Sequence, residues 1–430
     1  MIEIINSKHS EQLTAKLKRI RERSVALDTR LMDEVAQIIT NVRTRGDAAL
    51  IEYAAQFDGY EMSRAGLRVA PARLLETARQ ADETVLRGLR EAIRNVRTFH
   101  EHQREASWEF EPAAGVRLGQ RIKPIDKVGL YVPGGTASYP SSVIMNVVPA
   151  QVAGVKRIVV VTPPLALQKN PAVAAALGEL GVTEIYAAGG AQAIAALAYG
   201  TETIPAVNKI TGPGNRYVAA AKKLVFGVVG IDSIAGPSEV VILADETARA
   251  DFVAADLLAQ AEHDEDAAAV LITNDEALAN DVAGELARQI AELPRQAIAQ
   301  KSLRQFGAII QVGNLNEGAI IVNDLAPEHL EIITADDEAV ATGIENAGAI
   351  FFGSYTPEAV GDYFAGPNHV LPTGGAARFS SALGVYDFVK RTSLLRYSQA
   401  ALMACAHTVS ALAQAEGLDA HARSASMREK

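Results

Sequence analysis

The central part of the chain alternates short apolar runs with alanine-rich segments of helical spacing. Each apolar run is rich in β-branched residues and leads into a turn that contains glycine or proline. The first runs are residues 128–132, 157–162, 184–188 and 209–211. Because a helix between two such runs returns the chain to the start of the next strand, this order predicts a parallel, doubly wound sheet.

The same alternation repeats further along the chain, which predicts a second α/β unit after the first. The runs and helical segments of this second unit are residues 240–244, 250–263, 269–273, 276–293 and 307–312. Neither unit contains the G-x-G-x-x-G fingerprint of dinucleotide-binding folds, so we expect two incomplete Rossmann-like units.

Both ends of the chain have helical spacing instead. Apolar residues recur every three or four positions between Leu31 and Val42, and Gly46 then supplies a stop. Residues 83–102 repeat this spacing as a partly exposed helix would. After Phe388 the chain returns to helical spacing and ends in a polar tail, so we expect a helical region at each end.

Composition and charge exclude several classes of protein. At 430 residues the chain is long enough for two or three domains of about 150 residues, and 49% hydrophobic residues exclude wholesale disorder. The net charge is −10 and no basic run is present, which argues against a nucleic-acid partner. A single cysteine, Cys405, excludes an internal disulfide and every cysteine-rich zinc motif, so a metal site must use other ligands.

The sequence contains no recognisable membrane-spanning segment and no recognisable secretory signal. The longest uncharged stretch, residues 128–155, contains Pro133, Gly134, Gly135, Pro140 and Pro149, which a membrane-spanning helix would tolerate poorly. The first 13 residues have no apolar region after basic residues, so they do not form a secretory signal. We therefore expect a cytoplasmic protein.

Two glycine-rich turns follow predicted strands at residues 189–192 and 212–215. Glycine has no Cβ, so each turn lets the backbone approach a phosphate or sugar closely at the carboxyl end of a parallel sheet. Taken alone, the two turns fit a cofactor site or ordinary tight turns, and the spacing leaves both readings open.

Four of the eight histidines lie in helical segments without clustered partners: His9, His100, His102 and His407. We expect these to be solvated or capping residues. The other four lie among carboxylates and amides, where chemistry is possible.

Gln260 and His263 are three positions apart on a predicted helix and therefore project from one face. An amide oxygen and an imidazole on one face can supply two ligands to a divalent cation. The alternative is an acidic, solvated helix end, and spacing alone does not decide between them.

The remaining candidates lie in the last hundred or so residues. Pro327, Glu328 and His329 resemble the start of a helix, where the dipole favours an anionic Glu and a neutral His. This arrangement suits a pair of bases but also suits a plain helix N-terminus. The other candidate residues lie in predicted loops or in the C-terminal tail. They are Asp362, His369, Glu416 and His421.

Together the motifs resemble those of histidinol dehydrogenases. Residues 231–239 (IDSIAGPSE) followed by 260–263 (QAEH) are similar to that family's signature. Further similar motifs, in the family's order, are residues 131–135 (YVPGG), 189–201 (GGAQAIAALAYGT), 212–215 (GPGN), 327–330 (PEHL), 361–363 (GDY) and 366–373 (GPNHVLPT).

This resemblance implies an enzyme that oxidises L-histidinol to L-histidine in two NAD-dependent steps, through the bound aldehyde. It implies one Zn²⁺ per active site and an intertwined homodimer. The implied zinc ligands are Gln260, His263, Asp362 and, from the other subunit, His421. The implied acid–base residues are Glu328 and His329. The implied NAD contacts are Tyr131, Gln192 and Asn215. The implied substrate contacts are Ser238, Gln260, His263, His329, Asp362, His369, Glu416 and His421.

With the resemblance, the expected organisation has four parts. Residues 1–124 form an N-terminal helical region that joins the first Rossmann-like domain. Residues 125–236 form the NAD-binding domain, residues 237–381 form the first Rossmann-like domain with most zinc and catalytic residues, and residues 382–430 form a helical tail that reaches the partner subunit.

The residues also suggest a chemistry. Gln, Asp and two His form a nitrogen and oxygen set that suits Zn²⁺ with exchangeable positions. A neutral His329 accepts the alcohol proton, and Glu328 activates the water that hydrates the aldehyde. A zinc hydrolase with Glu328 as its base, or a non-catalytic nucleotide-binding protein, are the competing hypotheses.

Overall fold

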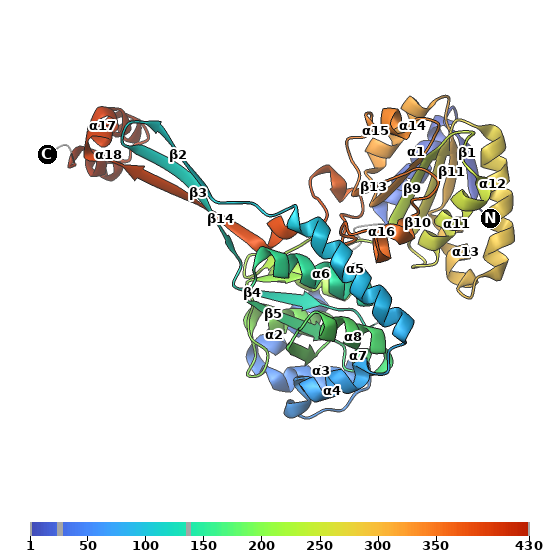
Figure 1. The fold of residues 1–430 in the computed structure, drawn as a ribbon, viewed down its shortest axis with the longest axis horizontal. Helices are drawn as coiled ribbons and strands as arrows, with labels where there is room; N and C mark the ends of the chain where they lie inside the picture. Colours follow the sequence, from blue (N-terminus) through green and yellow to red (C-terminus); the bar gives the residue numbers. More distant parts are fainter. Residues whose placement is uncertain (1, 24–28, 135–138, 429–430) are drawn as a thin grey trace.

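The computed structural model describes residues 2–23, 29–134 and 139–428, which form two α/β lobes and a projecting arm (Figure 1). We call the lobe with the six-stranded sheet the first lobe and the lobe with the five-stranded sheet the second lobe. Both sheets are parallel throughout, so the predicted α/β class with two doubly wound units is confirmed.

The first lobe has the strand order β1-β11-β10-β9-β12-β13. Its strands are β1 (Glu3–Asn6), β9 (Glu239–Ala244), β10 (Ala268–Thr273), β11 (Ala308–Gln311), β12 (His329–Ile333) and β13 (Ala349–Phe352). Its helices are α1 (Ser10–Glu22), α11 (Ala250–Ala261), α12 (Glu276–Gln289), α13 (Gln296–Gln305), α14 (Leu315–Leu325), α15 (Asp337–Ala341) and α16 (Glu358–Tyr363).

Both faces of this sheet are covered. Along β9, Val240 and Ile242 belong to the apolar cluster on one face, whereas Val241 and Leu243 belong to the cluster on the other. A strand that is buried on both faces reads as a continuous apolar run, which is why its sequence predicted it well.

The second lobe has the strand order β6-β5-β4-β7-β8. Its strands are β4 (Lys127–Tyr131), β5 (Arg157–Thr162), β6 (Glu184–Ala187), β7 (Lys209–Thr211) and β8 (Gly230–Ile231). Its helices are α2 (Thr29–Arg45), α3 (Asp47–Asp58), α4 (Pro71–Ala78), α5 (Glu83–Glu101), α6 (Pro140–Ala153), α7 (Ala166–Lys169), α8 (Pro171–Glu179), α9 (Gly190–Tyr199) and α10 (Arg216–Val225).

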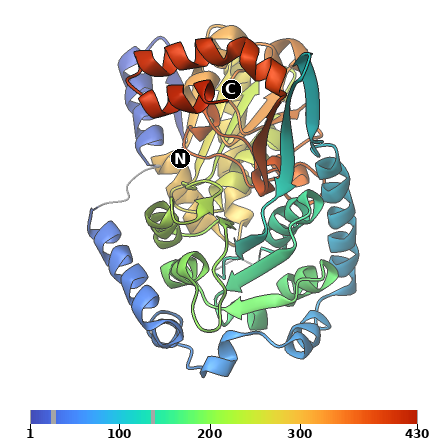
Figure 2. The ribbon, with the colours of Figure 1, turned by 90° about the vertical axis from the view of Figure 1, so that its left-hand side faces the viewer.

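The arm is a three-stranded antiparallel sheet that carries two helices at its tip. Its strands are β2 (Trp108–Ala113), β3 (Val116–Pro124) and β14 (Val389–Tyr397), in the order β14-β3-β2. Helices α17 (Gln399–Ala415) and α18 (Asp419–Ser426) pack on each other at the tip, where the chain ends (Figure 1). Figure 2 looks at the molecule from the side of the arm.

The two ends of the chain differ from the expected helical regions. Residues 3–6 form an edge strand of the first lobe, residues 29–101 pack on the second lobe, and residues 108–124 belong to the arm. Within the expected helical tail, residues 389–397 form β14 because they pair with β3 over its whole length. In the described residues, no helix combines the length and apolarity needed to cross a membrane.

Candidate active site

Glu328 and His329 lie where the chain enters β12. The sequence predicted a helix start at Pro327, and this prediction was wrong. Helix α14 ends at Leu325, and Ala326 takes a left-handed conformation with φ of +49°, after which the chain is extended. Both side chains are therefore held at the amino end of a buried strand in the interior of the sheet.

The His329 ring is oriented by a backbone carbonyl. Its Nδ1 lies 3.2 Å from the Glu239 carbonyl oxygen, which accepts the Nδ1 proton, so Nε2 is the free nitrogen. Among the described residues Nε2 has no hydrogen-bond partner, and it lies 4.0 Å from Asp362 Oδ1. Burial lowers the pKa of His329 to about 4. The ring is therefore a neutral base at pH 7.

Glu328 is held by the same short segment. Its Oε2 accepts the backbone N–H of Glu239 at 3.1 Å, and the Ser238 side chain also donates to it. Burial, followed by the charge of Glu239, raises the pKa of Glu328 well above its usual range. A carboxylate with a raised pKa is a stronger base than an exposed one.

Gln260, His263 and Asp362 lie beside this pair. Gln260 is buried at the end of α11, and its amide nitrogen donates to His263 Nδ1 at 3.0 Å. His263 lies just past the helix end, and its charge would act on both His329 and His369. His369 Nδ1 donates to the Asp362 carbonyl at 3.0 Å and lies 3.6 Å from Oδ1.

Gln260, His263 and Asp362 are chemically suited to bind a cation, and an oxygen atom of Gln260 that is unsatisfied among the described residues supports this. Gln260 Oε1 is buried, and the part of the chain that is described offers it no hydrogen-bond partner. A buried amide oxygen without a partner is costly unless a ligand satisfies it. Together with an imidazole and a carboxylate, it gives the borderline donor set that Zn²⁺ accepts.

Glu358, the first residue of α16, was not among the site residues predicted from the sequence. Its Oε1 lies 3.7 Å from His329 Nδ1. His329, Glu358 and Asp362 each offer a potential ligand atom, and these atoms lie within 4.8 Å of one another. Burial, then the charges of Asp362 and Glu328, raise the pKa of Glu358 well above its usual range. Its position four residues before Asp362 was the available sequence signal, since both lie on one helical face.

The site borders the second lobe. Asn95 of α5 donates to the carbonyl oxygen of Phe364 at 2.8 Å, and Asn368 donates to the Met145 carbonyl at 2.7 Å. The buried part of the site therefore faces the lobe that contains the glycine-rich turns.

In the second lobe, the three predicted cofactor contacts lie at or after the carboxyl ends of strands: Tyr131 is the last residue of β4, Gln192 follows β6 and Asn215 follows β7. The Tyr131 hydroxyl accepts the N–H of Gly190 at 3.1 Å, and burial raises the pKa of Tyr131 to about 12. Gln192 is buried in the first turn of α9, and Asn215 caps α10 by accepting two backbone N–H groups. Gly135 of the YVPGG motif lies outside the described residues.

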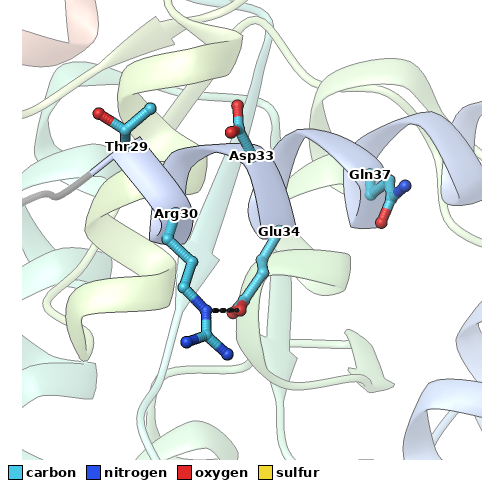
Figure 3. Close-up of a pocket in the computed structure, with 5 residues that line it drawn as sticks. All are labelled: Thr29, Arg30, Asp33, Glu34 and Gln37. Atoms are coloured by element: carbon cyan, nitrogen blue, oxygen red, sulfur yellow. Dashed lines mark hydrogen bonds and ion pairs between the residues drawn. The ribbon is translucent and has the colours of Figure 1, made fainter.

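Two other features take no part in this cluster. Figure 3 shows a surface hollow lined by side chains of the first turns of α2, where the Arg30 Nε donates to Glu34 at 3.1 Å. His100, expected to be solvated or capping, is instead buried, and its Nδ1 lies 2.7 Å from the Val96 carbonyl oxygen. That histidine is a core residue of α5.

Glu416 and His421 are not brought to the cluster within one chain. Glu416 directly follows α17 and His421 belongs to α18, and both are exposed. These helices lie at the tip of the arm, at the opposite end of the molecule from α16 (Figure 1).

Comparison with known proteins decides the family, because a model of histidinol dehydrogenase matches residues 21–429. The chain belongs to the histidinol dehydrogenase family. It is 55% identical to the histidinol dehydrogenase of Halalkalibacterium halodurans over 398 residues, which are 92% of this chain and 93% of that one. It is 53% identical to the Bacillus subtilis histidinol dehydrogenase over 397 residues, 92% of each chain.

A solved structure of the same family also matches this chain. The crystal structure of histidinol dehydrogenase from Elizabethkingia anophelis matches with a TM-score of 0.91 and 35% identity, covering 96% of this chain and 95% of that one. The resemblance seen in the motifs is thus confirmed. As a member of the histidinol dehydrogenase family, the chain is an oxidoreductase of histidine biosynthesis.

Proposed function

We propose that this chain is a zinc-containing, NAD-dependent enzyme that oxidises L-histidinol through L-histidinaldehyde to L-histidine. One observation carries the proposal. In a chain of this family, a neutral buried imidazole and a carboxylate with a raised pKa converge at the amino ends of β9 and β12. With them lies a buried amide oxygen that has no hydrogen-bond partner among the described residues.

In the first step His329 is the base. Its Nε2 accepts the hydroxyl proton of the alcohol while the carbon loses a hydride, so the C–O bond becomes a carbonyl. Nδ1 keeps its proton and donates it in a hydrogen bond to the Glu239 carbonyl oxygen, which fixes the ring through the step. NAD, when bound, accepts the hydride.

The second step needs water. Only the hydrate of the aldehyde carries a second transferable hydride, so water must first add to the carbonyl. Glu328 takes one proton of that water as the new C–O bond forms, and the protonated His329 gives its proton to the former carbonyl oxygen, so that the hydrate results. His329 then accepts a hydroxyl proton again as the hydrate gives up its hydride to a second NAD, when bound, and becomes a carboxylic acid. A positioned base typically contributes about 10²–10⁴ in rate.

We assign the metal to Gln260, His263, Asp362 and His421 of the partner subunit, and the remaining substrate contacts to Ser238, His369 and Glu416. Zn²⁺, when bound, supplies exchangeable positions for the imidazole and amine nitrogens of the substrate. The orphaned Gln260 Oε1 supports this assignment.

We assign NAD to the turns after β4, β6 and β7, with contacts from Tyr131, Gln192 and Asn215. The location is supported by Tyr139, which follows β4. After burial and Asp362, the charge of Tyr139 contributes to the raised pKa of Tyr363 in the first lobe. Tyr139, directly before α6, therefore lies near Tyr363, the neighbour of Asp362.

We further propose a homodimer in which the arms are exchanged. Apolar side chains of the arm are exposed in one chain: Trp108 is 51% exposed, Phe110 52%, Leu395 71% and Leu412 65%. Contiguous exposed apolar surface on a monomer indicates an association site. Exchange would carry Glu416 and His421 to the partner's cluster. We place the enzyme in the cytoplasm, where a biosynthetic dehydrogenase meets NAD.

A zinc hydrolase would also use Glu328 to activate water. Its reaction would not need a second base, whereas the oxidation of an alcohol needs one, and His329 Nε2 can supply it. The deciding experiment incubates the zinc-loaded protein with histidinol and excess NAD. We expect two NADH per histidinol consumed and histidine as product. No NADH from a zinc-loaded protein would overturn the proposal.

A further inference from the structure

Arg23 is buried beside the catalytic segment although it comes from the N-terminal helix. It directly follows α1, and its side chain is 1% exposed. Its guanidinium donates to the Glu239 carboxylate, to the Ser238 carbonyl at 3.1 Å and to the Asp266 carbonyl. One side chain therefore joins the start of β9 to the turn that follows His263.

Glu239 is a buried carboxylate whose negative charge is compensated by the guanidinium of Arg23. Its side chain is 8% exposed, and its second oxygen accepts the Gly374 N–H at 3.1 Å. Burial raises the pKa of Glu239, and the charge of Arg23 opposes that rise. Removing one partner of a buried ion pair leaves an uncompensated charge, which forces the local structure to change.

The backbone of Glu239 holds both catalytic side chains. Its N–H donates to Glu328 Oε2, and its carbonyl oxygen accepts the His329 Nδ1 proton. A shift of this one residue would move both bases at once. Because reacting groups must be placed closely, a displacement of about 1 Å can cost about 10²-fold in rate.

We propose that Arg23 is a positioning residue for catalysis, acting through Glu239 to hold Glu328 and His329 in place. The N-terminal helix is thereby part of the catalytic apparatus, although it contributes no group that touches the substrate. This inference rests on the proposed function, since it is measured through histidinol oxidation.

The test compares Arg23→Met with three other variants. Arg23→Met should lower kcat in both half-reactions by about 10²-fold, with KM for histidinol within about twofold and unchanged zinc content. Arg23→Met/Glu239→Gln should recover about tenfold over Arg23→Met, because the unpaired charge is removed. Arg23→Lys should lie between wild type and Arg23→Met, since it keeps the charge but loses the planar fork.

Arg21→Met is the matched control. Arg21 lies in the last turn of α1, two residues before Arg23, and pairs with Asp324 at the surface, 3.0 Å away. The kcat of Arg21→Met should therefore stay within about twofold of wild type. If Arg23→Met does not fold, Arg23→Lys replaces it in the comparison, and its kcat should likewise be lower than that of the wild type at unchanged KM.

Three results would overturn the inference: wild-type kcat in the folded Arg23 variant, a rise in KM without loss of kcat, or no recovery in the double variant. An inactive wild-type protein would instead contradict the proposed function. The two failures are therefore distinguishable.

Discussion

The cluster of the first lobe and the tip of the arm carry the same kinds of side chain in opposite surroundings. Glu328 and His329 are buried and held by the backbone of Glu239. Glu416 and His421 have comparable chemistry but are exposed at the far end of the molecule. One chain thus presents a preorganised pair of bases and, separately, two side chains whose surroundings a single subunit does not supply.

This difference indicates how the proposed site divides its work. Burial shifts the pKa of His329 down and that of Glu328 up, so the chemistry of proton transfer is prepared inside one chain. In the proposed dimer, the arm contributes to a site only when it meets the partner subunit. The proposed zinc site combines both regions, and substitutions should therefore have effects that depend on which region they change.

The largest effect is expected for His263→Asn. This substitution removes one of four proposed zinc ligands, so zinc should be lost or strongly weakened and both half-reactions should fall by about 10⁴-fold. Elemental analysis of the purified variant measures the metal. Full zinc occupancy would contradict the ligand assignment.

Next comes Glu328→Gln, which keeps the shape of the side chain but removes the base. Aldehyde oxidation should fall by about 10²–10⁴-fold, whereas alcohol oxidation should be spared because His329 accepts that proton. The half-reactions are measured separately, starting from histidinol and from histidinaldehyde. Equal losses in both would argue against water activation by Glu328.

A smaller effect separates the two steps by pH. The pKa of His329 is depressed to about 4, so this base stays unprotonated as the pH falls towards 5. The pKa of Glu328 is raised, so this base becomes protonated at a higher pH than an ordinary Glu. In pH–rate profiles, aldehyde oxidation should therefore decline first on acidification. Coincident acid limbs would be evidence that one group limits both steps.

The smallest effect is expected for Cys405→Ser. A thiohemiacetal mechanism would need a cysteine at the cluster, but Cys405 lies on α17 of the arm, where its Sγ donates to the Leu402 carbonyl. Turnover should stay within about twofold of wild type. A loss of several orders of magnitude would instead indicate covalent catalysis.

The sequence predicted the fold best where strands are buried on both faces. Strand β5 has the predicted bounds, because its nearly continuous apolar run leaves little ambiguity. Strand β7 also has the predicted bounds, although only Ile210 in it is apolar, and Gly212 and Pro213 mark its end. Strand β14 was missed because its residues are largely exposed and polar, and because its partner, β3, is distant in the chain. Such pairing is decided by tertiary contacts rather than by local spacing.

In the candidate site, too, the sequence predicted local pairs of residues better than contacts between distant segments. The spacing of Gln260 and His263 indicated a shared ligand pair, and the two side chains do meet at the end of α11. The helix predicted at Pro327 is instead a strand, since Ala326 turns the chain out of α14. Glu358 and Arg23 were missed, because their importance comes from burial beside residues far away in the sequence.

The central claim is that the first lobe of one subunit and the arm of its partner complete one site. Mixing inactive His263→Asn and His421→Asn variants tests it most directly. In a hybrid dimer one site regains both residues, so random exchange should restore about a quarter of wild-type activity. If mass-tagged subunits exchange fully and activity stays at the level of the separate variants, the site is not shared between subunits.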